Sequence, residues 1–357
     1  MNRNIKFLHL DGAWMNHAFL RLSAYHRHME RDNIFFGDVI EKNFLEPNYD
    51  IVYVSLIFFD EKNPEFQKNR EDHIRRQYPE SKVIFGGCGS TNPKGTIEEL
   101  IGFDSYFASY DYSMYENTKY DTGFSYGYLS KGCRNKCSFC VVPNIEGKIV
   151  SVAKVPQLFR GSQSLHNKKR YAKKLVIMDN DFFGNPDWKE RCEEIIKGKY
   201  MVSFNGGINI RKIEDEQVHY LTLIKSHDDS FKSQRMYVAF DNPKDEKLFR
   251  RGAELFAKHG LAGEKNGEKV LVYMLINYWN KDIEEAKNRY EVIKEYGFVP
   301  YPMLYDDEHA SEEFKNFRRW AIRRETRRTC TFDEYKQHGS KAPAMKKMLA
   351  NQTSLFD

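Results

Sequence analysis

The chain of 357 residues is 41% hydrophobic and 30% charged, with a formal net charge of +5, which is the balance of a soluble globular protein of two or three domains. No run approaches the roughly 18 apolar residues of a membrane-spanning helix, and the first four residues lead directly into a strand-like run. We therefore expect neither a secretory signal nor a transmembrane anchor. Three of the six cysteines fall in one loop, which fits the reducing cytoplasm better than a disulfide framework.

The first third of the chain alternates short apolar strands with amphipathic helices. Strand-like runs lie at 5–10, 51–58 and 82–87, and helical periodicity lies around 19–25 and 65–78. This alternation predicts a small doubly wound, Rossmann-like α/β domain at residues 1–120. His17, His26 and His28 fall on the first helical run, where we expect packing or surface positions for them.

A cysteine-rich loop follows at residues 132–143, with the sequence GCRNKCSFCVVP. Cys133, Cys137 and Cys140 have the spacing C-x3-C-x2-C, and soft thiolates select iron–sulfur clusters or zinc. Structural zinc normally needs a fourth ligand, yet no other His or Cys lies within twenty residues of the loop on either side. A cubane cluster on three cysteines instead leaves one iron open for a substrate or cofactor.

The cysteine spacing, with Phe139 before the last cysteine, resembles the radical S-adenosylmethionine superfamily. The flanking sequences YGYLSKGC and CxxCVVP resemble its methylthiotransferase and cobalamin-domain branches. The resemblance implies a 4Fe–4S cluster whose open iron chelates S-adenosylmethionine. Reductive cleavage, with an electron from a donor such as flavodoxin or ferredoxin, would form a 5′-deoxyadenosyl radical that abstracts hydrogen from the substrate. The alternatives are a reduced cysteine loop and a zinc-binding loop.

The N-terminal domain resembles the cobalamin-binding-type domain that precedes many barrels of this superfamily. The D-x-H-x-x-G motif, whose histidine ligates cobalt, is missing from this sequence. We therefore do not expect cobalamin, although some relatives bind it without that histidine. Many methylthiotransferases also carry a second cluster on three N-terminal cysteines, and Cys88 is the only cysteine before the loop, which argues against a second cluster here.

Residues 121–308 repeat the pattern strand, loop, helix, which is similar to the partial (β/α)6 barrel of the superfamily. Strand-like runs lie at 126–130, 175–178, 201–204, 236–240, 270–276 and 299–304, and helical segments at 187–197, 245–259 and 283–296. Barrel chemistry occurs at the carboxyl ends of the strands, where polar residues cluster in this sequence. Helix capping or solvation is the alternative role for any single one of them.

The resemblance implies roles for polar residues after the second and third barrel strands. Asp179, Asn180 and Asp181 take the position where the superfamily often has G-G-E, which holds the amino group of S-adenosylmethionine. The departure from G-G-E leaves open which of the three would do so. Asn205 and Arg211 are the candidates for the ribose and the carboxylate, because arginine pairs bidentately with carboxylates.

Two further residues are expected beside the cofactor. Asp241 follows a later strand and would contact cofactor or substrate at the same mouth. Phe139, inside the cysteine loop, would place its backbone near the adenine. No lone cysteine or tyrosine stands out in the sequence as a second hydrogen donor.

Residues 309–357 predict a basic helical tail with a flexible terminus. From Lys315 to Lys347 eleven Lys and Arg face three Asp and Glu, a local charge of +8 that leaves −3 for the rest (5 minus 8). Phe314, Phe317 and Trp320 share one face of a helix at 312–328, which predicts a helix closing the barrel with its arginines solvated. The alternative is a surface that faces the phosphates of DNA or RNA.

The final residues from Gln352 to Phe356 read QTSLF and resemble the peptide with which bacterial DNA-modifying and repair proteins dock to the replication sliding clamp. Chance is the alternative for so short a motif. From these features we predict a cytoplasmic radical S-adenosylmethionine enzyme acting on a nucleic acid or nucleotide. The alternatives are the same class acting on a peptide or small metabolite, such as a cobalamin-type methyltransferase, and a non-catalytic protein that binds zinc or a cluster.

Overall fold

The computed structural model describes residues 2–28, 30–56, 64–87, 110–162, 171–263, 265–279 and 282–338. The chain divides into two compact units, the first made of Met1–Leu129 and Val152–Leu175, and the second of Ser130–Ser151 and Val176–Asp357. This division differs from the predicted ranges, because the segment after the cysteine loop returns to the first unit. The predicted α/β class is confirmed, since the main sheets consist of parallel strands.

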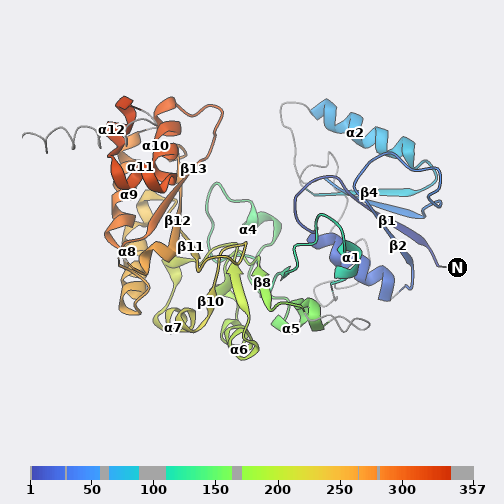
Figure 1. The fold of residues 1–357 in the computed structure, drawn as a ribbon, viewed down its shortest axis with the longest axis horizontal. Coiled ribbons are helices and arrows are strands. Elements are labelled where there is room, and N and C mark those ends of the chain that lie inside the picture. The colour runs from blue at the N-terminus through green and yellow to red at the C-terminus, as the bar shows by residue number, and fades with distance from the viewer. Residues whose placement is uncertain are drawn as a thin grey trace, which may run out of the picture. The chain divides into compact units, whose positions relative to one another are not determined.

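The first unit begins with alternating strands and helices. Its elements are β1 (Asn4–His9), α1 (His17–His28), β2 (Asn33–Gly37), β3 (Ile51–Ser55), α2 (Pro64–Gln77), β4 (Lys82–Gly86), η2 (Tyr112–Tyr115), β5 (Ser125–Gly127), α5 (Val155–Leu158) and η3 (Arg160–Ser162). The sheet has the order β2-β1-β3-β4, with every pair parallel. The helices α1 and α2 lie on opposite faces of this sheet (Figure 1), as expected for a doubly wound domain.

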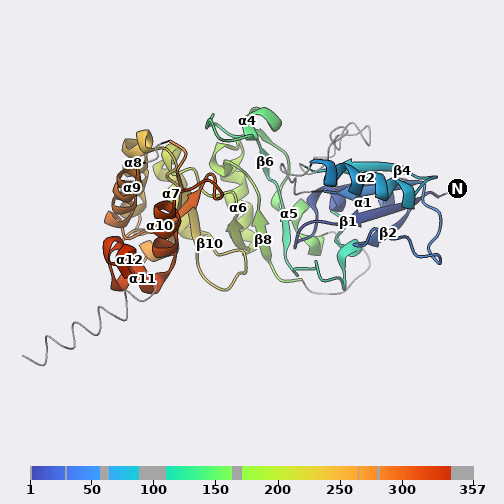
Figure 2. The same ribbon diagram turned by 90° about the horizontal axis from the view of Figure 1, so that it is seen from above.

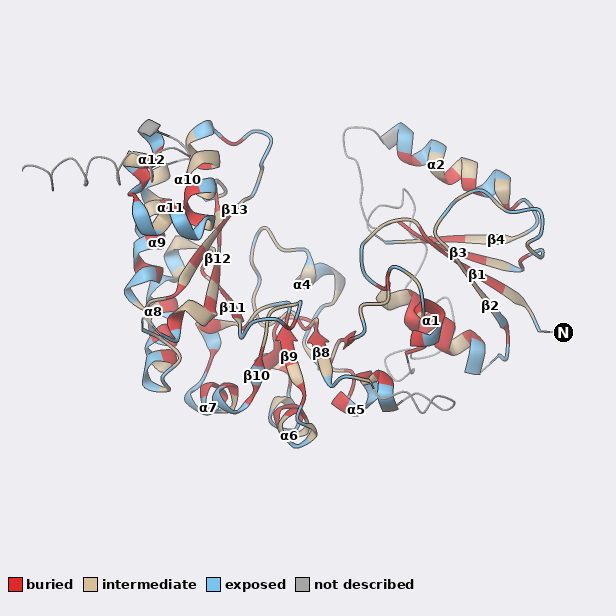
Figure 3. Cartoon of the chain, viewed as in Figure 1, coloured by how far each residue is buried: buried red, intermediate tan, exposed pale blue. Residues whose placement is uncertain are grey.

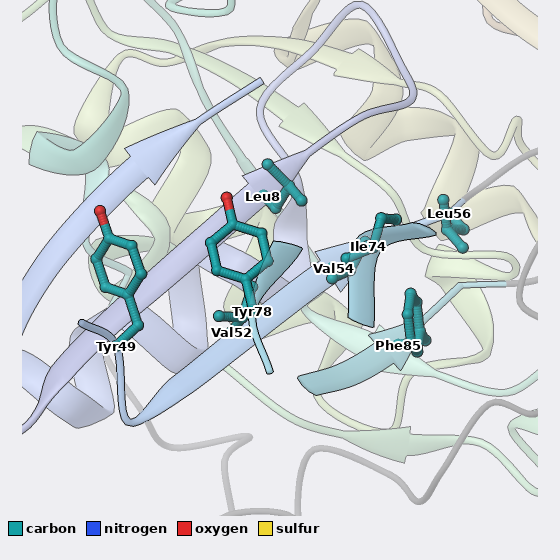
Figure 4. Packing of buried hydrophobic residues seen from close by; sticks show 8 residues of the cluster. All are labelled: Leu8, Tyr49, Val52, Val54, Leu56, Ile74, Tyr78 and Phe85. Carbon is teal, nitrogen blue, oxygen red and sulfur yellow. The ribbon is translucent and has the colours of Figure 1, made fainter. Parts of the chain in front are cut away.

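Side-chain alternation along the strands explains why both faces of this sheet are covered. Leu8 of β1 belongs to a buried cluster with Ile74 of α2 and Tyr78, the residue that follows α2 (Figure 4). Its neighbour Phe7 points to the other face, where it contacts Phe19 of α1 with ring centroids 5.1 Å apart. Successive residues of a strand face opposite sides, so one apolar strand supplies the core beneath each helix.

The sequence did not predict β2, the edge strand of this sheet. Its five residues pair only with β1, and none of them is fully buried. The strand has the sequence NIFFG, so its apolar run covers only three residues, Ile34 to Phe36. A run this short does not by itself identify a strand.

The histidines of α1 have structural positions, as predicted. His17 Nε2 lies 2.9 Å from the Tyr110 hydroxyl, and His28 is exposed. His26 is buried, with Nδ1 2.8 Å from Asp32 and Nε2 3.0 Å from the hydroxyl of Tyr53. Both ring nitrogens of His26 thus have protein partners.

His9, at the end of β1, is a fully buried histidine. Its Nδ1 lies 2.8 Å from the Tyr115 hydroxyl, and its ring stacks on Tyr120 with centroids 4.3 Å apart. Burial lowers the pKa of His9 from its usual value of 6.5. The unfolded chain therefore takes up a proton at this residue before the folded chain does.

We expect the stability of the first unit to fall as the pH drops below about 6.5, because protons then favour the unfolded chain. Above that pH both states carry neutral His9 and its contribution is fully present. Hydrogen exchange of β1, compared at about pH 7.5 and 5.5 and corrected for intrinsic rates, measures the effect. His9→Phe removes the titrating ring and should flatten the pH dependence. If the stability of this variant fell with pH as steeply as that of the wild type, the pH dependence would come from other titratable groups.

The second unit carries the cysteine loop and most of the predicted barrel. Its elements are β6 (Ser130–Lys131), α4 (Val142–Ile145), β7 (Val150–Ser151), β8 (Lys174–Ile177), η4 (Phe182–Gly184), α6 (Trp188–Gly198), β9 (Met201–Phe204), η5 (Ile210–Lys212), α7 (Asp215–Leu223), β10 (Lys225–Ser226), β11 (Met236–Ala239), η6 (Pro243–Asp245), α8 (Glu246–Lys258), η7 (Gly267–Lys269), β12 (Val270–Ile276), α9 (Ile283–Glu295), β13 (Val299–Leu304), α10 (Glu312–Ile322), α11 (Arg324–Thr329) and α12 (Phe332–His338). The strand β8 begins at the last residues of the first unit.

Parallel strands followed by helices build this unit, as the barrel interpretation requires. The strands β11, β12 and β13 form one parallel sheet, and a bridge between Ile208 and Val238 connects the segment after β9 to β11. The strands are largely buried, whereas the helices mix buried and exposed residues (Figure 3). The predicted first barrel strand at 126–130 is instead two short strands, β5 in the first unit and β6 in the second.

The last three helices pack beside β13 and α9 (Figure 2). Phe314, Phe317 and Trp320 of α10 are buried, which confirms the prediction of an aromatic stripe that faces the protein. The helix predicted at 312–328 ends at residue 322 and restarts as α11. No helix in the described part of the chain is long and apolar enough to cross a membrane. The segment from Gln352 to Phe356 lies outside the described residues.

Candidate functional site

The cysteine loop is closed at its base by the antiparallel strands β6 and β7, which pair Ser130 with Ser151 and Lys131 with Val150. Gly132 follows β6 with φ of +87°, and a Cβ there would lie 2.6 Å from the backbone of Lys148. Only glycine tolerates both this conformation and this approach. The residue before the first cysteine therefore fixes the direction in which the loop leaves the strand.

Cys133, Cys137 and Cys140 are half-buried and line one pocket, which we call the cysteine pocket. Burial raises the pKa of Cys133. Among the described residues, no three Cys, His, Asp or Glu side chains converge as ligands of a single metal ion do. The cysteines of a cubane cluster bind separate irons, so they need a shared rim rather than one shared point.

The cysteine pocket lies wholly within the second unit. Its lining residues are Cys133, Asn135, Cys137, Phe139, Cys140, Val142, Asn180, Gly206, Gly207, Ile208, Asn209, Arg211, Val238, Ala239, Asp241 and Tyr273. Four segments therefore form the walls of this pocket: the cysteine loop, the turn after β8, the turn after β9 and the end of β11. Four of the predicted cofactor residues, Phe139, Asn180, Arg211 and Asp241, are among them.

Asp179 and Asp181 are buried and hold the cysteine loop in place. Asp179 accepts hydrogen bonds from the backbone N–H and the hydroxyl of Ser130, at 2.8 and 2.6 Å. Asp181 accepts from Nε and Nη2 of Arg134, at 2.7 and 2.9 Å. Of the three residues in the G-G-E position, only Asn180 lines the pocket. In this structure the carboxylates of Asp179 and Asp181 bind residues of the cysteine loop and of the strand before it. Direct binding of the cofactor by these carboxylates stays a prediction.

Glu146, at the end of α4, is a residue of this site that sequence reasoning missed. Its Oε2 accepts from the Gly132 N–H at 2.8 Å and from Asn180 Nδ2 at 2.9 Å, and its Oε1 pairs with Lys131 at 3.0 Å. One carboxylate thereby ties the start of the loop to the turn after β8. The sequence contained no signal for this role, because the pairing depends on how the loop folds back on itself.

The turn after β9 presents Asn209, rather than Asn205, to the pocket. Asn205 is exposed and does not line it, whereas Asn209 does. Ile208 and Ile210 are buried, so the residue between them points the other way. That alternation was readable in the sequence and would have identified Asn209.

Arg211 and Asp241 line the pocket from neighbouring segments, as predicted. Arg211 Nη2 donates to Cys137 Sγ at 3.6 Å, and Nη1 pairs with Asp245 at 2.6 Å. Burial alone would lower the pKa of Arg211, but the hydrogen bonds to Cys137 and Asp245 raise it. Asp241 accepts from the Leu275 N–H at 2.9 Å, and burial raises the pKa of its carboxyl.

A buried arginine braces the strand ends behind this wall. Arg289 of α9 is 3% exposed and donates to the backbone oxygens of Phe240, Asp241 and Leu275 at 2.8 to 3.0 Å. Its charge is balanced by Glu285, with which it forms an ion pair. The helix after β12 therefore fixes the carboxyl ends of β11 and β12, and with them Asp241.

An aromatic rim lies beside the cysteine loop. Phe139 contacts Tyr278 and Trp279 with centroids 5.6 and 6.3 Å apart, and the Tyr278 hydroxyl donates to Ser138 Oγ at 3.0 Å. Tyr305, at the end of β13, is 55% exposed and contacts Tyr278. We call Phe139, Tyr278, Trp279 and Tyr305 the aromatic rim. It offers flat, partly exposed surface at the mouth of the site.

The pocket residues fit a polar cofactor held beside a cluster. Both side-chain atoms of Asn209 are buried without a hydrogen-bond partner among the described residues, a state that costs free energy unless a ligand satisfies them. Gly206 would place a Cβ 2.1 Å from the Asp179 backbone oxygen, so this wall must remain without a side chain. Three thiols, an unpartnered amide and an arginine therefore surround one space.

Comparisons with known proteins agree with the cysteine motif. Neither a family model nor a solved structure matches the chain. Curated relatives named ribosomal protein uS12 methylthiotransferase RimO come from Chloroherpeton thalassium (26% identity over 250 residues, 61% of this chain and 55% of the relative) and Sulfurihydrogenibium sp. (26% over 265 residues, 68% and 55%). A third, from Opitutus terrae, is 30% identical over 107 residues, which are 28% of this chain and 21% of the relative.

The chain spans about half the length of the first two relatives. The similarity covers more than half of this chain in those two matches, so it extends well beyond the cysteine loop. A shared short motif alone would not produce matches of that length. The homologues of this chain are thus methylthiotransferases, which are enzymes of the radical S-adenosylmethionine superfamily.

Proposed function

We propose that this protein is a radical S-adenosylmethionine enzyme with a 4Fe–4S cluster on Cys133, Cys137 and Cys140. The cysteine pocket is the observation that carries the proposal, because it brings the three thiols together with Asn209 and Arg211. When bound, the cluster and S-adenosylmethionine would supply radical chemistry through one-electron cleavage of the sulfonium, which would release methionine. The 5′-deoxyadenosyl group would become 5′-deoxyadenosine by taking a hydrogen atom from the substrate. The electron would come from an external reductant.

The protein residues in this proposal bind, orient and shield. Asn180 and Asn209 offer amide groups to the cofactor's polar atoms, and Arg211 offers a guanidinium to a carboxylate. Arg211 also donates to Cys137 Sγ, and hydrogen bonds to cluster sulfurs tune reduction potentials. Gly206 and Gly207 line the pocket without side chains and would admit the cofactor closely, and Phe139 lines the pocket from the cysteine loop.

We propose a polypeptide as the substrate. The relatives are named for a ribosomal protein, and the aromatic rim gives exposed Trp and Tyr beside the site. Such residues anchor protein partners, because they bury large area at low entropic cost. This assignment departs from the nucleic-acid substrate predicted from the sequence.

The nucleic-acid substrate remains the second candidate, supported by the basic segment from Lys315 to Lys347. Within the described residues four of its six arginines have a carboxylate within ion-pair distance. Arg318 pairs with Asp307 at 2.9 Å, and Arg324 and Arg328 both pair with Glu268. Paired arginines attract phosphates less strongly, which is why we rank this candidate lower.

Sulfur insertion is not part of the proposal. The sequence before the loop holds one cysteine, Cys88, whereas a second cluster of the methylthiotransferase kind uses three. We propose that the chain generates the radical and modifies its substrate without that second cluster.

Anaerobic reconstitution with iron and sulfide tests the proposal. The reconstituted protein should bind about four irons and sulfides per chain and form 5′-deoxyadenosine from S-adenosylmethionine and dithionite. Basic polypeptides such as ribosomal proteins should accelerate turnover, and transfer RNA or DNA should not. Tightly bound zinc without iron–sulfur absorbance, and no cleavage, would leave a non-catalytic binding protein. Acceleration by nucleic acid alone would restore the second candidate.

A further inference from the structure

A second pocket, of about 440 Å³, lies between α9 and the last three helices. It shares no lining residue with the cysteine pocket. Phe317, Trp320 and Phe332 form its apolar side, and Tyr290 and Arg327 contribute polar groups to it. We call it the Arg327 pocket. Its volume lies within the range of small-molecule sites.

Tyr290 leaves a polar group unsatisfied in this pocket. The residue is 1% exposed, and its hydroxyl is buried with no hydrogen-bond partner among the residues that the structure describes. Its ring contacts Trp320 with centroids 4.8 Å apart, so the hydroxyl is held in position by packing. A buried hydroxyl without a partner costs free energy that a ligand atom can recover.

Arg327 leaves a positive charge uncompensated beside that hydroxyl. The other lining cations have carboxylate partners: Lys287 pairs with Glu284, Lys294 with Glu291, and Arg328 with Glu268. Within the described ranges no carboxylate pairs with Arg327, whose Nη1 donates only to the Ile322 backbone oxygen at 3.2 Å. Burial lowers the pKa of Arg327, and the nearby Arg328 and Arg324 lower it further, against the attraction of Tyr290 and Glu268. An anion placed there would relieve this repulsion.

We propose that the Arg327 pocket binds a small organic anion with a flat apolar body. The carboxylate or phosphate group pairs with the Arg327 guanidinium, and an oxygen of the ligand satisfies the Tyr290 hydroxyl. The apolar body lies against Phe317, Trp320 and Phe332. The site is separate from the radical chemistry, so it holds whether or not the proposed function does.

Titration calorimetry of the full chain tests this site with benzoate and phenyl phosphate. Inorganic phosphate tests the anionic group without the apolar body, and benzylamine tests the aromatic ring with a positive charge in place of a negative one. At least one aromatic anion should bind, inorganic phosphate should bind more weakly than phenyl phosphate, and benzylamine should not bind. The proposal is overturned if benzylamine binds, or if neither benzoate nor phenyl phosphate binds. Equal affinities for inorganic phosphate and phenyl phosphate would show that the apolar side of the pocket does not contribute to binding.

Two variants and one control locate the binding. Arg327→Gln should weaken it roughly tenfold or more, because a charge-assisted hydrogen bond is lost. Tyr290→Phe should weaken it a few-fold without lowering thermal stability, since it also removes the unpaired hydroxyl. Arg319→Gln, on the neighbouring helix α10 and outside the lining, should leave the affinity unchanged. Wild-type affinity in folded Arg327→Gln and Tyr290→Phe would place the ligand elsewhere.

Discussion

Replacing Cys137 by alanine is expected to abolish 5′-deoxyadenosine formation, down to the level measured without enzyme. Cys137 is the middle cysteine of the loop, a proposed cluster ligand, and accepts a hydrogen bond from Arg211 at 3.6 Å. The spacing leaves no neighbouring thiol to take its place in the loop. Iron and acid-labile sulfide content, followed by the cleavage assay under anaerobic conditions, measures both the cluster and its chemistry.

Cys192→Ala is the matched control for this experiment. Cys192 lies on α6, is 0% exposed, and burial raises its pKa to about 12, so it stays a protonated thiol and cannot replace a lost ligand. Its removal should cost only about 1 kcal/mol of stability through the small cavity it leaves. Full cluster content in the Cys137→Ala protein, or loss of the cluster in the Cys192→Ala protein, would contradict the ligand assignment.

Asp181→Asn is expected to destabilise the folded chain by about 3 kcal/mol, at the lower end of the cost of breaking a buried ion pair. Asp181 is 0% exposed and receives two hydrogen bonds from Arg134, whose side chain is 28% exposed. The asparagine keeps one acceptor but no charge, so the arginine stays desolvated without compensation. Urea unfolding at neutral pH measures the change in the free energy of unfolding.

Asp215→Asn provides the surface comparison. Asp215 pairs with Lys258 at 2.7 Å, and both side chains are more than half exposed. Exposed pairs contribute little because water and salt screen them, so this variant should unfold like the wild type. Equal losses in the free energy of unfolding would mean that the buried Asp181 pair contributes no more stability than the exposed Asp215 pair. A stable Asp181→Asn protein that fails to bind a cluster would instead favour a direct role at the cofactor.

The sequence predicted the parts of this molecule that local patterns encode. Long apolar runs with period two or 3.6 marked most strands and helices, and the cysteine spacing marked the loop. β2 was missed because its apolar run, Ile34 to Phe36, is only three residues long. Glu146 was missed because its partners lie up to 34 residues away, and no local pattern records a contact formed on folding.

The candidate site was predicted at the level of segments rather than side chains. The turns after β8 and β9 were correctly placed beside the cysteine loop, yet Asn209 lines the pocket in place of Asn205. Asp179 and Asp181 support the loop, and Asn180 alone of the three lines the pocket. The buried neighbours Ile208 and Ile210 could have identified Asn209. The three residues after β8 are all polar, so residue type does not show which of them points into the pocket.

The cysteine loop is fastened by residues made later than itself. Asp179 and Asp181 follow their partners Ser130 and Arg134 by 49 and 47 residues, and Arg211 follows Cys137 by 74. During synthesis the loop leaves the ribosome before any of these anchors does. Its thiols are then held only by their own short hairpin, open to oxidation and to stray metal ions. We therefore expect the proposed iron–sulfur cluster to assemble only after the third barrel strand, β9, has been synthesised. A ribosomal pause between the loop and β9 would prolong the period in which the cysteines are unprotected.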